Sequence, residues 1–169
     1  MSDIPWTEKY RPDNFKEIIL EEENRILLEN IVKNNKFTNL LFHGPPGIGK
    51  TTTIINLIKC YQKKYNQENK SLCIHLNASD ERGIDIIRNN LNNFVNSDNL
   101  FYEGTKFVIL DEVDYMTRTA QLALKSLIQE YNNNIKYCLI CNYISKIEQS
   151  LQDEFIKIRF NTLSKNDIF

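Results

Sequence analysis

The chain has 169 residues, of which 41% are hydrophobic, and its 21 Lys and Arg nearly balance its 22 Asp and Glu. This length suits one domain with a substantial core, and the net charge of −1 excludes a global attraction to nucleic acid, so any such binding needs local patches. The sequence has no apolar run long enough to span a membrane, and its first five residues do not resemble a signal peptide. We therefore expect an intracellular protein with reduced cysteines and no membrane partner.

Two elements are expected before the first strand. Residues 1–14 read as a polar, proline-containing arm. Residues 21–33 are predicted to be a helix, because apolar side chains recur there at three- and four-residue spacings and the acidic run at 21–23 suits the positive end of a helix. The first strand is then expected at residues 39–42.

The stretch after this strand follows the pattern Gly, four residues of any kind, then Gly-Lys-Thr. An apolar run precedes it and a helix-compatible run at 53–59 follows, which is the strand–loop–helix context of a phosphate-binding loop. Lys50 is expected to reach the β- and γ-phosphates and Thr51 to bind Mg²⁺; the alternative is a glycine-rich turn that binds nothing. The predicted nucleotide contacts are Gly44, Pro45, Pro46, Gly47, Ile48, Gly49, Lys50, Thr51 and Thr52.

The rest of the chain alternates apolar, strand-like runs with amphipathic helical segments. After a polar surface connection at 61–70, we expect strands at 72–76, 107–110, 137–141 and 156–160, and helices at 84–96 and 119–131. Nearly continuous apolar strands that alternate with helices predict an α/β fold, with a parallel sheet covered by helices on both faces.

Two adjacent carboxylates, Asp111 and Glu112, follow the third predicted strand. Open α/β sheets bind ligands at the carboxyl ends of their strands, so Asp111 is expected to hold Mg²⁺ and Glu112 to polarise a water for attack on the γ-phosphate. The alternative is an exposed acidic turn. Asp114 either supports this site from behind or is a solvated residue at the start of a helix.

Three residues at the fourth predicted strand allow two readings each. Asn142, at its end, either bonds the attacking water or the γ-phosphate, or is a turn residue. Cys138 and Cys141 have the spacing of a redox or half-zinc site, but they lie in an apolar run without a second pair nearby in the sequence. We therefore expect two buried thiols.

Together these residues resemble an AAA+ ATPase, and more narrowly the small subunits of replication factor C, the sliding-clamp loader. The resemblance runs from about residue 5 to 160. It rests on the runs 5–12, 44–51, 76–84 and 110–117. The runs 85–88 and 138–143 are most similar to the subunit called 5 in the human-type complex and 3 in yeast.

The resemblance implies an AAA+ P-loop domain at residues 1–162, with a five-stranded parallel sheet in the order 5-1-4-3-2, and the start of an otherwise absent lid at 163–169. It implies that Lys50, Thr51, Asp111, Glu112 and Asn142 take the phosphate, metal, base and sensor roles. The implied adenine contacts are Tyr10, Arg11 and Pro12, and the implied DNA contacts are Arg88 and Arg82, the alternative for either Arg being a solvated charge.

By this resemblance the chain is an ATP- and Mg²⁺-dependent ATPase subunit of a nuclear, hetero-pentameric replication factor C. That complex loads a PCNA-type sliding clamp onto primer–template DNA. Two other functions remain open: a nucleotide-sensing scaffold subunit with little turnover, and another AAA+ remodelling ATPase, against which the arm at 5–12 argues. Phe94, Leu100 and Phe101 are candidate clamp contacts, with a core position as the alternative for Phe94.

One departure from the family lies before the fifth strand. Family members carry Ser-Arg-Cys there, and its Arg reaches the ATP of the neighbouring subunit. This sequence has Asp153, Glu154 and Phe155 instead. A carboxylate cannot stabilise negative charge that develops on a γ-phosphoryl group, so we expect the chain to supply no such arginine in trans; a shifted role for Lys157 is the alternative.

Overall fold

The computed structural model describes residues 15–79, 84–97, 104–132 and 135–162, and the statements below concern those residues. Five parallel strands form one sheet in the order β2-β3-β4-β1-β5, which confirms the predicted order 5-1-4-3-2. The strands are β1 Leu40–His43, β2 Cys73–Asn77, β3 Lys106–Asp111, β4 Ile135–Cys141 and β5 Ile156–Arg159.

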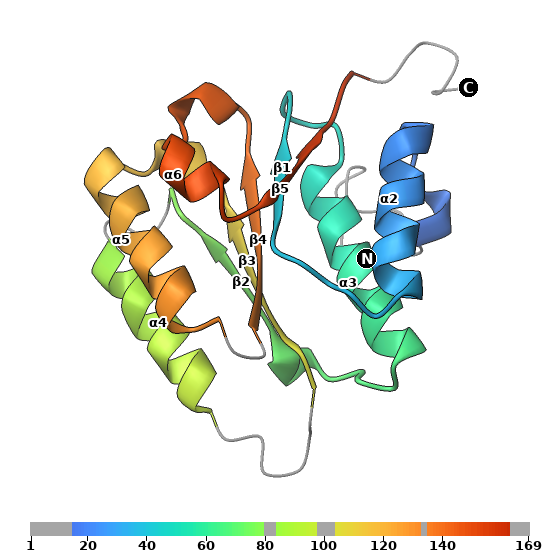
Figure 1. Ribbon diagram of the computed structural model, residues 1–169, viewed down its shortest axis with the longest axis horizontal. Helices are drawn as coiled ribbons and strands as arrows, with labels where there is room; N and C mark the ends of the chain where they lie inside the picture. Colours follow the sequence, from blue (N-terminus) through green and yellow to red (C-terminus); the bar gives the residue numbers. More distant parts are fainter. Residues whose placement is uncertain (1–14, 80–83, 98–103, 133–134, 163–169) are drawn as a thin grey trace, which may run out of the picture.

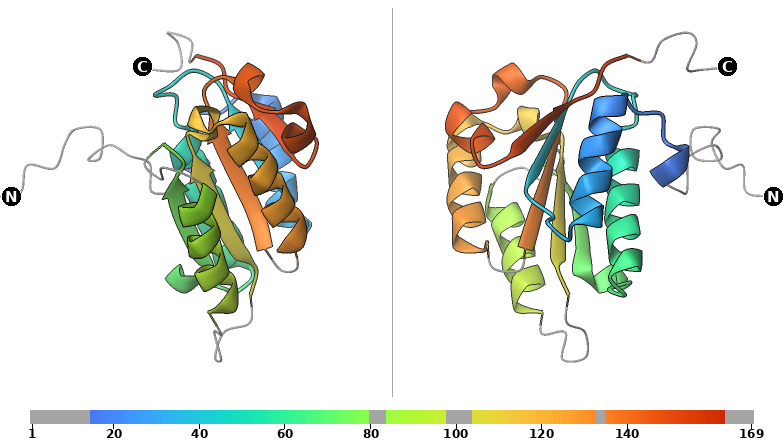
Figure 2. Two further views of the ribbon diagram at one scale, coloured as in Figure 1. Left: turned by 90° about the vertical axis from the view of Figure 1, so that its left-hand side faces the viewer. Right: turned by 45° about the vertical axis from the view of Figure 1, so that its right-hand side comes forward.

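Helices cover both faces of this sheet, as predicted. Figure 1 shows α2 and α3 on one side and α4 and α5 on the other, and the right-hand view of Figure 2 also shows these layers on opposite sides of the sheet. The helices are α2 Glu22–Lys33, α3 Lys50–Lys64, α4 Ile84–Asn96, α5 Arg118–Glu130 and α6 Gln149–Gln152. Short 3-10 segments are η1 Phe15–Glu17, η2 Lys70–Leu72, η3 Val113–Tyr115 and η4 Ile144–Lys146.

Each face of the sheet has its own core, because neighbouring strand residues point to opposite faces. On β4, Cys138 packs with α2 and α3, whereas Cys141 packs with α4 and α5. Both thiols are free and buried, as expected, and burial raises the pKa of Cys141 to about 12. Within the described ranges, no cluster of His, Cys, Asp and Glu is suited to a metal ion.

The predicted surface connection at 61–70 is wrong in its first part. Helix α3 continues to Lys64 and buries Tyr61, whose ring meets Phe37 and Phe107 at centroid distances of 5.3 and 5.7 Å. The polar side chains around Tyr61 hide this aromatic anchor in the sequence, and tertiary packing extends the helix. The five strands and the helices α2 and α5 lie within two residues of their predicted limits, and α4 has the predicted limits. Helix α3 also begins three residues before the predicted run, and α6 and the four 3-10 segments were not predicted.

The fold places three strand ends side by side at one edge of the sheet. Because all strands are parallel, the segments that follow β1, β3 and β4 emerge at this carboxyl edge, where ligands bind in open α/β sheets. No helix of the described residues is both long and apolar enough to cross a bilayer.

Candidate functional site

The loop between β1 and α3 is shaped by three glycines. Gly47 and Gly49 have φ angles of 75° and 86°, in the left-handed region that favours glycine, and a Cβ built at either meets no described atom within 4 Å. At Gly44 a Cβ would collide with the carbonyl oxygen of Phe160. The loop therefore keeps an open concavity at the N-terminus of the 15-residue α3, an arrangement suited to an anion.

Lys50, the first residue of α3, is directed back into this loop. Its side chain is buried, and Nζ donates to the carbonyl oxygens of Gly44 at 2.8 Å and Pro45 at 2.6 Å. Nζ also donates to Asn142 Oδ1 at 3.0 Å, so the residue after β4 reaches the loop after β1. Burial lowers the pKa of Lys50, and the Asp111 carboxylate offsets part of that effect. The Lys50 amine thus lies among oxygen acceptors from the loop and from the end of β4.

Thr51 and Asp111 form a pair of oxygen donors next to Lys50. The Thr51 hydroxyl donates to Asp111 Oδ2 at 2.7 Å. Burial raises the pKa of Asp111, but His75, whose Nε2 lies 3.7 Å away, the Thr51 hydroxyl and the Glu112 N–H outweigh it, so the pKa lies below its usual value. Asp111 is therefore a carboxylate at neutral pH, and this hydroxyl–carboxylate pair is the donor type that Mg²⁺ prefers.

Glu112 follows Asp111 in a left-handed conformation, with a φ angle of 56°. Such a conformation is costly for a residue other than glycine and is concentrated at functional sites. Its carboxylate accepts a hydrogen bond from the Ser79 hydroxyl. Ser79 is itself oriented by Asn77 Oδ1, which accepts from the backbone N–H of Ser79 at 3.0 Å, while the single hydroxyl hydrogen of Ser79 is donated to Glu112.

Our reasoning from the sequence missed Ser79 and Asn77. Both lie in the run 76–84 that carried part of the resemblance, but the residue pattern assigned neither a role. The pairing of β2 with β3 aligns Asn77 with Asp111 and thereby brings Ser79 to Glu112. The role of Ser79 follows from this strand register, which a local sequence pattern does not reveal.

Asp114 is a further polar residue at this edge. It is buried, and Oδ2 accepts the N–H groups of Asn142 and Tyr143 at 3.2 and 3.1 Å. The alternative of a solvated helix-start residue is therefore wrong, because η3 turns the side chain inward against the end of β4.

Other predicted residues fall outside this cluster. Arg88 on α4 is exposed and pairs with Asp85 at 3.1 Å, and Phe94 is half-buried against the core beneath α4. The remaining predicted contacts lie outside the described residues: Tyr10, Arg11, Pro12, Arg82, Leu100 and Phe101.

Around the phosphate loop, Pro45 and Pro46 are exposed and line a cavity of about 640 Å³ together with Asn142. Ile48 and Thr52 are half-buried. Of the predicted loop residues, Gly44, Pro45 and Pro46 line this cavity.

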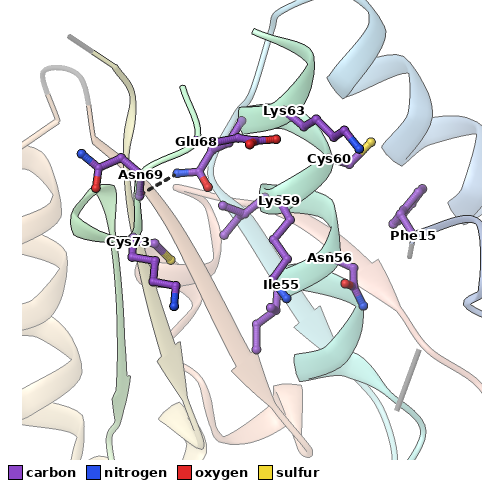
Figure 3. Close-up of a pocket in the computed structure, with 12 residues that line it drawn as sticks. Phe15, Ile55, Asn56, Lys59, Cys60, Lys63, Glu68, Asn69 and Cys73 are labelled. Carbon is purple, nitrogen blue, oxygen red and sulfur yellow. Dashed lines mark hydrogen bonds between the residues drawn. The ribbon is translucent and has the colours of Figure 1, made fainter. Parts of the chain in front are cut away.

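A different cavity, of about 850 Å³, lies beside α3 (Figure 3). Phe15, Ile55, Lys59 and Cys73 are among its lining residues. It shares no lining residue with the phosphate loop or the acidic pair, so the candidate site lies elsewhere, at the carboxyl edge of the sheet.

The edge between α6 and β5 carries the residues that depart from the family pattern. Glu154 Oε1 accepts from Gln129 Nε2 on α5 at 2.7 Å, and Asp153 Oδ1 accepts from Gln149 Nε2 on α6 at 2.7 Å. Phe155 is buried in the core, whereas Lys157 is exposed on β5. Two carboxylates, each hydrogen-bonded to a glutamine, thus lie where the family pattern has Ser-Arg.

Comparison with known proteins gives a consistent picture. The family described as "ATPase family associated with various cellular activities (AAA)" matches residues 40–163. Replication factor C subunit 3 of Schizosaccharomyces pombe is 40% identical over 99% of this chain and 48% of its own length, and human replication factor C subunit 5 is 42% identical over 95% and 47%. The chain thus spans about half the length of these curated relatives.

Solved structures agree on the fold. A RuvB mutant from Thermotoga maritima superposes with a TM-score of 0.70 at 16% identity, covering 94% of this chain and 51% of that chain. A DNA polymerase III gamma subunit-related protein from the same organism gives 0.65 at 18% identity, covering 83% and 46%. At such identities the likeness concerns the fold alone.

Proposed function

This chain belongs to the AAA family of ATPases, and on that premise we propose that it is an ATP-binding and ATP-hydrolysing subunit of a clamp loader of the replication factor C type. The observation that carries the proposal is the joining of three strand ends: Lys50 bonds Asn142, and Thr51 bonds Asp111. The relatives that match almost the whole chain are named replication factor C subunits, which supports the choice among AAA functions.

The residues at the carboxyl edge fit a magnesium-bound nucleoside triphosphate. The open concavity at Gly47 and Gly49 leaves room for phosphates beside backbone N–H groups, and Thr51 with Asp111 supplies hard oxygen donors. Mg²⁺, when bound, neutralises charge that builds up on phosphoryl oxygens. We propose that Lys50 exchanges its loop carbonyls for phosphate oxygens, whose negative charge offsets the cost of burying its ammonium group.

Glu112 and Asn142 take complementary roles in this proposal. The Glu112 carboxylate accepts a proton from the attacking water, and the Asn142 amide orients the groups around Lys50. In the structure the Ser79 hydroxyl occupies one oxygen of the Glu112 carboxylate, and we propose that this bond breaks before hydrolysis. In this proposal the Ser79–Glu112 bond limits ATP hydrolysis without affecting ATP binding.

The wider assignments belong to the same proposal. Tyr10, Arg11 and Pro12 contact adenine, and the exposed Arg88 binds DNA phosphates, together with Arg82. Partner subunits complete a hetero-pentamer in the nucleus that acts on a PCNA-type clamp and primer–template DNA. Residues 1–162 form the nucleotide-binding domain, and a lid begins at residue 163.

A second function, the nucleotide-sensing scaffold, is favoured by one observation. The Glu112 carboxylate is bonded to Ser79 rather than left free for a water. A subunit in which this bond persists would bind ATP and respond to it without hydrolysing it.

The test replaces Glu112 by Gln in the protein assembled with its partner subunits. We expect ATP hydrolysis at this subunit to fall about 100-fold or more, while ATP binding is kept, because the amide cannot accept the proton of the water. Glu130→Gln, the same change at an exposed position on α5, is the control. ATPase activity that is unchanged in Glu112→Gln would support the scaffold, and a wild-type assembly that neither clamp nor primed DNA stimulates would contradict a clamp loader.

A further inference from the structure

Asp114 is a charged residue in an unusual place. The left-handed turn at Glu112 and the 3-10 segment η3 fold the chain back after β3, so that Asp114 lies against the end of β4 with 8% of its surface exposed. Its Oδ1 is buried, and in the described part of the chain it has no hydrogen-bond partner. Burying a carboxylate in this way costs stability, so stability alone does not explain the residue.

The other carboxylate oxygen holds the backbone of the residue that contacts Lys50. Oδ2 accepts the N–H groups of Asn142 and Tyr143, the first two residues after β4. Asn142 then directs its side chain to Lys50 Nζ at 3.0 Å. The position of this amide depends on the backbone beneath it, and Asp114 anchors that backbone.

The rest of the same loop is anchored by other side chains. Gln152 Nε2 donates to the carbonyl oxygens of Ile144 and Ile147 at 3.2 and 2.9 Å, and Gln152 is as buried as Asp114. Gln121 holds Lys146 and Glu148. Asp114 is thus distinguished from these anchors by its contact with residues 142 and 143.

We propose that Asp114 is a positioning residue that sets the Asn142–Lys50 contact and thereby determines how strongly the site prefers a nucleoside triphosphate to a diphosphate. This inference rests on the proposed nucleotide-binding function and extends it to a residue that touches neither the nucleotide nor the metal. Asp114 acts through the backbone of Asn142, from the segment after β3 to the segment after β4.

The experiment measures dissociation constants for a slowly hydrolysed ATP analogue and for ADP, by calorimetry on the intact protein well below its melting temperature. Asp114→Ala is expected to reduce the preference for the triphosphate about tenfold, which corresponds to about 1.4 kcal/mol. Asp114→Asn keeps an acceptor oxygen and is expected to stay within about twofold of the wild type. Gln152→Ala, which removes two loop bonds from an equally buried side chain, is the matched control and should leave the preference unchanged.

Two further measurements separate positioning from general stability. Amide hydrogen exchange at Asn142 and Tyr143 should accelerate in Asp114→Ala but not in Gln152→Ala, because only the first change removes their acceptor. Adding Asp114→Ala to Asn142→Ala should not reduce the triphosphate preference further, since residues that act through one contact are not additive. Should Asp114→Ala not fold, Asp114→Ser replaces it, because its hydroxyl is too short to reach both N–H groups.

The outcomes distinguish this inference from the function on which it rests. If Asn142→Ala lowers the triphosphate preference and Asp114→Ala does not, the positioning role is overturned while nucleotide sensing stands. If Asn142→Ala itself has no effect, the positioning role is overturned because it acts through Asn142, while nucleotide binding stands; if the wild-type protein binds neither nucleotide, the proposed function itself fails. A drop in melting temperature in Asp114→Ala with an unchanged preference would make Asp114 a structural anchor like Gln152, and would also overturn the proposal.

Discussion

The carboxyl edge of the sheet and the edge between α6 and β5 differ in the charged groups that they present. At the carboxyl edge, the ammonium of Lys50 lies among carbonyl, amide and carboxylate oxygens contributed by three strand ends. At the α6–β5 edge, Asp153 and Glu154 are held by glutamines, and the cation that the family resemblance leads one to expect is missing. The chain therefore carries the groups for a site of its own, whereas residues 153 and 154 at its other edge present carboxylates.

The difference follows from what each edge has to stabilise. A phosphate site needs donors and positive charge, and a preorganised cation is most effective where it is buried. Carboxylates at the second edge would repel a triphosphate. Substitutions at each of the two edges test this difference.

The largest effect is expected at the first edge. Lys50→Met keeps the length of the side chain but removes its charge and its hydrogen bonds, so ATP affinity should fall about 10- to 100-fold, in keeping with about 1.5–3 kcal/mol for a hydrogen bond to a charged group. Isothermal titration with ATP and Mg²⁺ measures it. Lys59→Met, on the same helix but exposed, is the control, and equal affinity in the two variants would contradict the assigned role of Lys50.

A gain of function is expected at the second edge. Glu154→Arg places a cation where the family carries one, and the neighbouring subunit should hydrolyse ATP faster by about tenfold or more, a part of what arginine fingers contribute elsewhere. The assay uses the assembled complex with this chain's own site silenced by Glu112→Gln. Glu154→Gln removes the negative charge without adding a positive one. An increase of the same size in that control would show that repulsion, rather than a missing arginine, limits the neighbour.

The smallest effect concerns the hydrogen bond that restrains Glu112. Ser79→Ala removes the hydroxyl, so basal ATP hydrolysis should rise about threefold, within the range that one hydrogen bond contributes. ATP affinity should stay the same because Ser79 does not touch the phosphate loop in the structure. Ser71→Ala, in η2 at the opposite end of β2, provides a control for the chemical change. A fall in basal rate would mean that Ser79 supports Glu112 in the active arrangement.

Much of this architecture was readable from local sequence. The spacing of glycines with Lys50 and Thr51, the apolar strands and the acidic pair at 111–112 predicted the sheet, its helices and the side chains of the site. These features are local, because a turn, a strand or a helix start depends on residues a few positions apart. The end of α3 was missed for the same reason, since Tyr61 is buried by Phe37 and Phe107, which are distant in sequence.

By itself, the sequence determined which groups stand at the strand ends. Only the tertiary structure decided how they are paired: Lys50 with Asn142, Ser79 with Glu112, and Asp114 with the backbone after β4. These partners are 92, 33 and 28 residues apart. Their contact is set by the order and register of parallel strands, which bring distant chain segments to the same edge, and no local pattern encodes that register.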